Sequence, residues 1–192
     1  MSTRLLLEHE SVCQTLLHTD HAWLARTSLD LLRHDVVYAV RTVVRDGAGR
    51  VREEEREVAI VFQLFPDHPR VAPLVICQQD DVFNTHIHDV RRGDPPVSVV
   101  CMGTFHAERR LGDWVEAVWD VLAWRRIASD HPLNPEAAAW ARSQSGDPGR
   151  WPVDPREFAR PRRSRALPAA PAQQPEEPAP AGLRILSPWR PS

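Results

Sequence analysis

The sequence predicts an α+β domain with an N-terminal helix, a four-stranded antiparallel meander sheet and C-terminal helices packed on the sheet. Two observations predict it. Segments rich in β-branched residues follow one another in the middle of the chain, and segments with the apolar spacing of helices lie on either side of them. Strands that follow one another without intervening helices pair antiparallel, so this order favours α+β over an alternating α/β fold.

The strands are expected at four places. Residues 36–44 and 58–65 are rich in Val and Ile, and Asp46 and Gly47 between them favour a tight turn, so these two segments predict an antiparallel hairpin. Residues 74–77 form a third short apolar run, and residues 97–100 form a strand-like apolar run after a long passage with weak structural signals. Long passages of this kind inside a compact domain are often functional.

Three helices are expected. The first spans residues 4–18, with apolar residues on one face, and the second spans residues 111–126, with a continuous apolar stripe. On the second helix, Trp114 is expected to face the sheet and Trp119 and Trp124 the opposite side. A third helix starts at Asn134-Pro135-Glu136, because Asn is a good N-cap and Pro suits the first helical turn.

Composition sets the domain boundaries and the class of protein. Of 192 residues, 1–142 are expected to form one domain and 143–192 a Pro-rich, largely disordered tail, since eleven of the eighteen prolines lie there. A net charge of −2 argues against nucleic acid as a partner, and no apolar run is long enough for a membrane span. Three irregularly spaced cysteines fit a reducing compartment, so a cytoplasmic location is expected.

Three motifs, in this order along the chain, resemble those of ubiquitin-conjugating (E2) enzymes. They are Phe65-Pro66-Asp67-His68-Pro69, then Cys101-Met102-Gly103, and then His131-Pro132-Leu133-Asn134-Pro135-Glu136-Ala137-Ala138. The last is nearly identical to the family's Pro-Leu-Asn-Pro-Glu-Ala-Ala helix start and is the most specific of the three. The resemblance covers roughly residues 36–142 and implies a UBC-like fold.

The resemblance implies that Cys101 accepts a ubiquitin-like modifier protein from an E1-like activating enzyme as a thioester and passes it to an amine. A thiol suits this task because it is both a nucleophile and a good leaving group. The chain looks like the divergent bacterial E2-like proteins of ubiquitination-like operons, which include a ubiquitin-like modifier, an E1-like enzyme and often a JAB-type protease. Such a setting suggests antiviral defence, and no cofactor is implied.

The remaining candidates depart from the family pattern. The family places His-Pro-Asn shortly before its cysteine, whereas this chain has Thr85-His86-Ile87-His88-Asp89 farther upstream. His86 or His88 is therefore a candidate hydrogen-bond donor to the oxyanion. Asp130 and His131 are candidates for taking the proton of the attacking amine. For His86 and His88 the alternative is an ordinary surface histidine, which is the commoner case, and for Asp130 and His131 it is a structural role in the approach to the helix.

Two other readings of the same residues stay open. The first is an inactive E2-like module that binds a ubiquitin-like protein without covalent transfer. The second, less favoured, is zinc binding by His86 and His88 with Cys101 or His106, although no zinc motif is present. Cys13 and Cys77 are expected to be buried apolar groups rather than nucleophiles.

All 24 basic residues are arginine, and the chain has no lysine. A compositional bias of the genome is the simpler explanation. The other explanation is functional: a protein that carries a reactive thioester is its own nearest acceptor, and a surface without lysine amines cannot be modified there.

Overall fold

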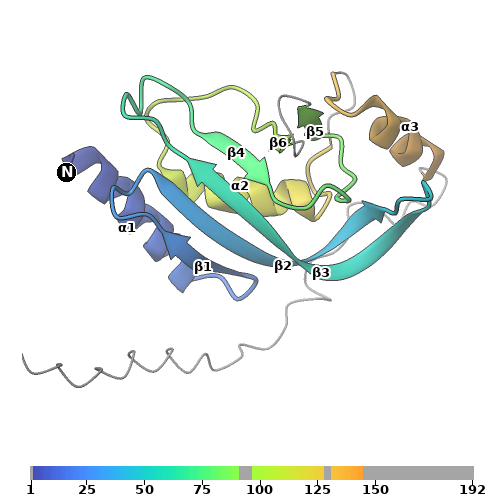
Figure 1. Ribbon diagram of the computed structural model, residues 1–192, viewed down its shortest axis with the longest axis horizontal. Helices are drawn as coiled ribbons and strands as arrows, with labels where there is room; N and C mark the ends of the chain where they lie inside the picture. Colours follow the sequence, from blue (N-terminus) through green and yellow to red (C-terminus); the bar gives the residue numbers. More distant parts are fainter. Residues whose placement is uncertain (1, 91–96, 128–130, 145–192) are drawn as a thin grey trace, which may run out of the picture. The chain divides into compact units, whose positions relative to one another are not determined.

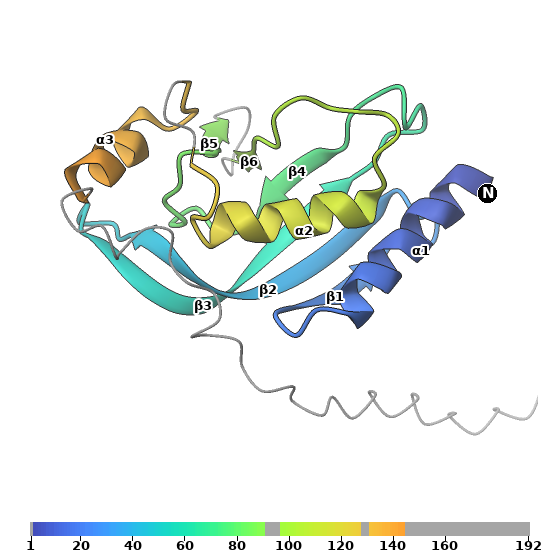
Figure 2. The ribbon, with the colours of Figure 1, turned by 180° about the vertical axis from the view of Figure 1, so that it is seen from behind.

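The computed structural model describes residues 2–90, 97–127 and 131–144. A six-stranded antiparallel sheet has the order β1-β2-β3-β4-β6-β5, and α1 and α2 both lie against one face of it (Figures 1 and 2). None of the helices in these ranges is both long and apolar enough to cross a membrane. The elements are α1 (Thr3–Leu17), β1 (Ala22–Thr27), β2 (Arg33–Arg45), β3 (Val51–Gln63), β4 (Leu74–Cys77), β5 (Ile87–Val90), β6 (Val97–Val100), α2 (Leu111–Leu122) and α3 (Pro135–Gln144).

The prediction of four strands was wrong, because β1 and β5 extend the sheet at its two edges. β1 pairs with β2 alone, and β5 pairs with β6 alone. An edge strand pairs with only one neighbour and can therefore contain more polar residues than a central strand. The sequence Ile87-His88-Asp89-Val90 is such a short, half-polar segment, and its pattern indicates a strand only weakly. β5 occupies part of the passage in which no regular structure was expected, and it brings His86 opposite Cys101.

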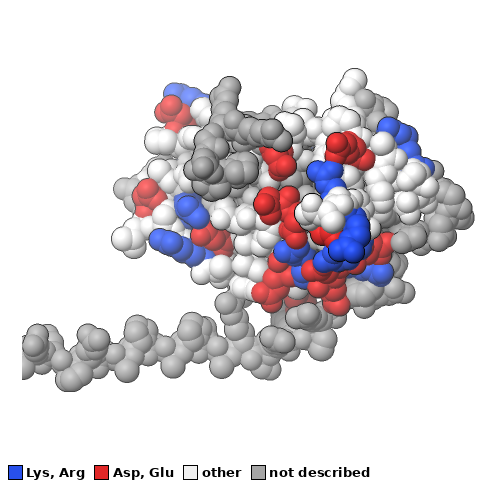
Figure 3. Space-filling view, turned by 45° about the vertical axis from the view of Figure 1, so that its right-hand side comes forward, with Lys and Arg blue, Asp and Glu red and all other residues white. Residues whose placement is uncertain are grey.

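The β2–β3 hairpin is the longest pairing in the sheet and confirms the predicted turn. It runs without a register shift from Arg33↔Gln63 to Arg45↔Val51. The Asp46 side chain closes the turn, because its Oδ1 accepts hydrogen bonds from the backbone N–H groups of Ala48 and Arg50 at 3.0 Å each. Arginine and acidic side chains alternate over this part of the surface (Figure 3), and several form ion pairs: Arg41–Glu53, Arg50–Asp46, Arg52–Glu54 and Arg56–Asp81.

The main core lies between the sheet and α1 with α2. Val36, Tyr38 and Val40 alternate inward along β2, and the Tyr38 hydroxyl donates a hydrogen bond to the Val115 carbonyl of α2 at 2.9 Å. This contact satisfies the one polar atom that the buried tyrosine brings into the core.

The second helix is shorter than expected and ends at Leu122 rather than at residue 126. Trp124 has a φ of 59°, so the chain turns sharply there. This turn carries Trp124 into the interior, where it is fully buried. Trp119, within the helix, is also buried, at 8% exposure, and packs against the His21 ring, so the prediction that both lie on the outer side was wrong. Helical spacing extrapolated past residue 122 could not describe the position of Trp124.

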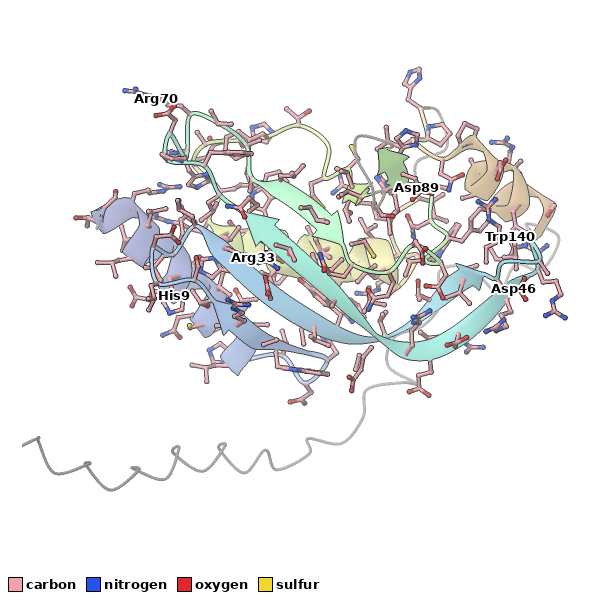
Figure 4. All side chains as sticks on the ribbon, viewed as in Figure 1. His9, Arg33, Asp46, Arg70, Asp89 and Trp140 are labelled. Atoms are coloured by element: carbon pink, nitrogen blue, oxygen red, sulfur yellow. The ribbon has the colours of Figure 1, made fainter. Side chains whose placement is uncertain are left out.

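A smaller core holds α3. Asn134 caps this helix as predicted, because its Oδ1 accepts a hydrogen bond from the Ala137 backbone N–H at 3.0 Å. The buried residues of this core come from β2, the segment before β5, the turn after α2, and α3. They are Val43, Phe83, Trp124 and Ala137, with Trp140 packed against them. Trp140 lies at the end of the domain where the β2–β3 hairpin turns (Figure 4).

Candidate active site

Cys101 follows the last residue of β6 and is partly exposed, whereas Cys77 is buried. All three cysteines are free thiols. Burial raises the pKa of Cys77 to about 11 and also raises the pKa of Cys13, which disfavours the nucleophilic thiolate at both positions. The prediction that Cys77 is a buried apolar group is confirmed, whereas Cys13 is only partly buried.

A backbone corner at residues 84–86 holds Cys101 in place. The Cys101 N–H donates a hydrogen bond to the His86 carbonyl at 2.8 Å. The N–H groups of Leu133 and Asn134 donate to the Thr85 carbonyl at 3.0 and 3.3 Å. The cysteine and the Pro-Leu-Asn-Pro segment, which are about thirty residues apart in the sequence, are thus fixed to two adjacent peptide groups.

Asn84 fixes this corner to α2. Its side chain is fully buried, its Nδ2 donates to the Val121 carbonyl at 2.7 Å, and its Oδ1 accepts from the His86 N–H at 2.9 Å. Both the nitrogen and the oxygen of this buried amide are hydrogen-bonded. Another backbone conformation at this corner would leave buried polar groups without partners, so the hydrogen bonds favour the observed one. The sequence analysis did not identify Asn84. The available signal was a polar amide directly after the apolar pair Val82-Phe83.

His86 is the predicted site residue that lies nearest to Cys101 in the hydrogen-bond network. It is 8% exposed, and its Nε2 is buried without a hydrogen-bond partner among the described residues. Burial lowers its pKa, the charge of Arg126 lowers it further, and a hydrogen bond with the Cys101 backbone opposes them. At neutral pH the ring is therefore uncharged, and an unpaired buried nitrogen of this kind is available to a bound group.

The other predicted residues lie farther from this arrangement or outside it. His88 is exposed on β5, where it pairs with Val99, and His131 is exposed. Neither ring makes a hydrogen bond to Cys101 or His86 among the described interactions. Asp130 lies outside the described residues. The structure therefore brings Cys101 and His86 together and leaves the roles of His88, Asp130 and His131 as predictions.

Arg126 lies beside the loop that follows Cys101. A Cβ built on Gly103, two residues after the cysteine, would lie 3.1 Å from Arg126 Nη2. Gly103 has a φ of 80°, which side-chain-bearing residues rarely adopt. Glycine therefore permits both the turn after Cys101 and the close approach of the guanidinium group.

The residues proposed for zinc do not gather as that interpretation requires. His86 is buried and His88 is exposed, so the two rings do not share an environment. Within residues 2–90, 97–127 and 131–144 there is no group of three or more His, Cys, Asp or Glu side chains able to hold a metal ion. Cys101 instead bonds through its backbone to His86, a neutral histidine, and lies two residues before the glycine that Arg126 approaches.

Comparison with known proteins found one type of similarity. No protein-family model matches the chain, and no curated protein matches it by sequence. Among solved structures, the chain is similar to one described as "Ubiquitin conjugating enzyme (putative) from Trypanosoma cruzi". The identity is 16%, the match covers 83% of this chain and 94% of that one, and the TM-score is 0.47. At this identity and TM-score, the likeness does not assign a function, which has to come from the site itself.

Proposed function

We propose that this protein is an E2-like conjugating enzyme. It accepts a ubiquitin-like modifier from an E1-like activating enzyme as a thioester on Cys101 and transfers it to an amine of a target. The observation that carries the proposal is the attachment of Cys101 and the Pro-Leu-Asn-Pro segment to adjacent peptide groups at Thr85 and His86. These are two of the three motifs that resemble E2 enzymes, and they meet at one backbone corner beside a partly exposed cysteine.

The proposed reaction has two displacements. In the first, the Cys101 thiolate attacks the carbonyl carbon of the E1-bound thioester, a new C–S bond forms, and the E1 cysteine leaves as a thiolate. In the second, an amine attacks the Cys101 thioester, a C–N bond forms, the C–S bond breaks and Cys101 leaves. Each displacement passes through a tetrahedral oxyanion, so each needs hydrogen-bond donors or positive charge near the carbonyl oxygen.

His86 has the position and the protonation state for one part of this chemistry. Its ring is neutral, so it can offer either an N–H donor or a lone pair, and its Nε2 has no other described partner. We assign His86 to the oxyanion or to the proton of the attacking amine. Asp130 and His131 stay candidates for accepting that proton, and His88 stays a candidate donor.

A gel experiment tests the proposal. The purified chain is incubated with ATP and with an E1-like activator and ubiquitin-like modifier from the same source, and the products are run with and without a thiol reductant. A reductant-sensitive adduct is expected for the native chain and for Cys13→Ser, and none for Cys101→Ala. Cys101→Ser is expected to give an adduct that resists reductant, because an oxygen ester replaces the thioester.

The result that contradicts an enzymatic role is equally specific. If the native chain binds the modifier but forms no covalent adduct, and Cys101→Ala binds it equally well, the chain is a binding module. If an adduct persists in Cys101→Ala, another residue is the acceptor.

A further inference from the structure

The sharp turn after α2 sends two consecutive arginines in different directions. Arg125 and Arg126 both donate their backbone N–H groups to the Asp120 carbonyl, at 2.8 and 3.1 Å. The Arg125 guanidinium group lies over the Trp119 ring, 5.4 Å from its centroid, and pairs with the Asp120 carboxylate at 3.3 Å. Arg126 instead reaches the Gly103 backbone, beside the cysteine.

Arg126 brings a positive charge to the site, and the described residues contain no carboxylate paired with it. No ion pair of Arg126 is present among the described residues, whereas neighbouring Arg125 is paired. Two separate observations place its guanidinium group beside residues that flank the cysteine: the 3.1 Å approach to the Cβ position of Gly103, two residues after Cys101, and its electrostatic effect on His86, whose carbonyl accepts the Cys101 N–H. A third observation indicates a place for a ligand, namely the buried and unpaired Nε2 of His86.

We propose that Arg126 supplies the positive charge of the Cys101 site and stabilises negative charge on the thiolate and on the acyl oxyanion. This inference rests on the proposed function. With His86 neutral, Arg126 places a permanent cation against the loop that follows the cysteine, because a guanidinium group stays protonated at any pH at which the protein works.

The absence of lysine from the chain gives this assignment a chemical reason. A lysine beside the thioester would hold a primary amine at high effective concentration and would capture the acyl group itself. In that side reaction, Nζ attacks the carbonyl carbon, a C–N bond forms, the C–S bond breaks, Cys101 leaves as a thiolate, and the surplus ammonium proton passes to water. Arginine provides the charge without a comparably nucleophilic nitrogen.

The charge can be measured without any partner protein. Cys101 is alkylated with iodoacetate, which is anionic, and with iodoacetamide, which is neutral, and both rates are read from the Cys101 peptide by mass spectrometry. Arg126→Gln is expected to lower the iodoacetate-to-iodoacetamide rate ratio about threefold at low ionic strength, and the difference should shrink at high salt. Arg125→Gln removes an equal charge one residue away and is expected to leave the ratio nearly unchanged.

Arg126→Lys separates charge from nucleophilicity. It is expected to keep the alkylation ratio of the native chain, because the positive charge is retained. After loading with modifier, it is expected to convert the reductant-sensitive adduct into a reductant-resistant one at position 126, and the native chain should not do so.

The outcomes distinguish the two proposals. Equal alkylation ratios for Arg126→Gln and Arg125→Gln would overturn the role of Arg126, whatever the chain's activity. A native chain that forms the thioester, together with an Arg126→Lys variant that is never modified at position 126, would also overturn it. A native chain that forms no thioester would refute the proposed function, and the alkylation ratio would still report the charge at Cys101.

Discussion

His34 on β2 is a fully buried imidazole on the α1 side of the sheet, and its neighbours form a short chain of side chains. His34 Nε2 lies 3.3 Å from His9 Nδ1, and His9 Nε2 lies 3.7 Å from Cys13 Sγ. Burial first, and then repulsion by His9, lowers the pKa of His34 to about 4, against a smaller opposing effect of Asp35. The folded protein therefore holds His34 neutral at pH values where the unfolded chain is already protonated.

This difference predicts loss of stability in acid. Between the ordinary histidine pKa of 6.5 and the folded value of about 4, the unfolded state binds more protons, so the free energy of unfolding falls as the pH falls through this window. The full effect is at most about 3.5 kcal/mol, from roughly 1.4 kcal/mol per pKa unit. Urea unfolding at pH 7.5, 5.5 and 4.5 should show a weaker pH dependence for His34→Gln than for the native chain.

The matched control is His18→Gln, which changes an exposed histidine at the end of α1. It should retain the pH dependence of the native chain. If His34→Gln and the native chain lose equal stability between pH 7.5 and 4.5, the buried imidazole does not cause the acid sensitivity.

At the scale of single residues, the sequence predicted two of the residues that the structure brings together at the candidate site. Cys101 and His86 were identified because a motif pointed to the one and a polar run before the cysteine to the other, and both lie at the same corner. Asn84 and Arg126 were missed for a physical reason. Asn84 joins two elements through a buried amide, and the position of Arg126 depends on the turn at Trp124. The spacing of residues along the sequence encodes neither feature.

At the scale of elements, α1 caps the N-terminus of α2. The Glu8 carboxylate, fully buried, accepts a hydrogen bond from the Leu111 N–H at 2.6 Å, and Ser11 Oγ accepts one from the Gly112 N–H at 3.0 Å. Arg4, at 2.5 Å, and His68, at 3.5 Å, lie beside the same carboxylate. A carboxylate at the N-terminus of the helix accepts a hydrogen bond from an otherwise unpaired N–H group. Its negative charge also interacts favourably with the positive end of the helix dipole.

The close approach of the two helices requires Gly112. A Cβ there would lie 2.5 Å from Thr15 Oγ1 and 2.6 Å from the Ser11 carbonyl oxygen, so the helices would have to separate. Gly112→Ala should lower the free energy of unfolding by roughly 1–3 kcal/mol, because overpacking outweighs the better helix propensity of alanine. Chemical denaturation measures the change.

Gly47→Ala is the control for this substitution. Gly47 lies in the β2–β3 turn, and a Cβ there would meet no atom within 4 Å. Its effect on stability should be small. Equal losses from the two substitutions would mean that α1 does not pack against Gly112 as described.

Elements were predicted well where their signal is local. The hairpin turn at Asp46, the third strand and the Asn134 cap were all correct, because each depends on residues within a few positions. The two edge strands and the end of α2 were not predicted, because pairing partners distant in the sequence and a positive φ at Trp124 decide them.

At the scale of the whole domain, the candidate site lies between two cores of unequal size. The main core joins the sheet to α1 and α2, and the smaller core joins α3 to Phe83 and Trp124. His9 on α1 and Trp140 on α3 mark opposite ends of the domain (Figure 4). Residues 84–86 directly follow Phe83, so the corner that holds Cys101 is connected to the smaller core through the backbone.

This arrangement predicts that packing in the smaller core keeps the residues around Cys101 in place, and that it contributes little to the free energy of unfolding of the whole domain. Trp140 packs edge-on against Trp124 at 5.5 Å and against Phe83 at 6.2 Å between ring centroids. Trp140→Ala removes both contacts and should loosen α3 together with the Leu133 and Asn134 amides bonded to Thr85. The main core does not include Trp140, so the N-terminal helix and α2 should be affected little.

Hydrogen exchange read by mass spectrometry measures both effects in one experiment. In Trp140→Ala, peptides covering residues 131–144 should exchange faster, and peptides covering α2 should exchange at the native rate, because local opening of α3 does not require the main core to unfold. The rate at which iodoacetamide labels Cys101 should also differ from the native rate, because the backbone corner at residues 84–86 loosens. Uniform acceleration across the domain would show that the two cores unfold as one unit, and unchanged exchange at residues 131–144 would show that Trp140 does not hold the segment beside the site.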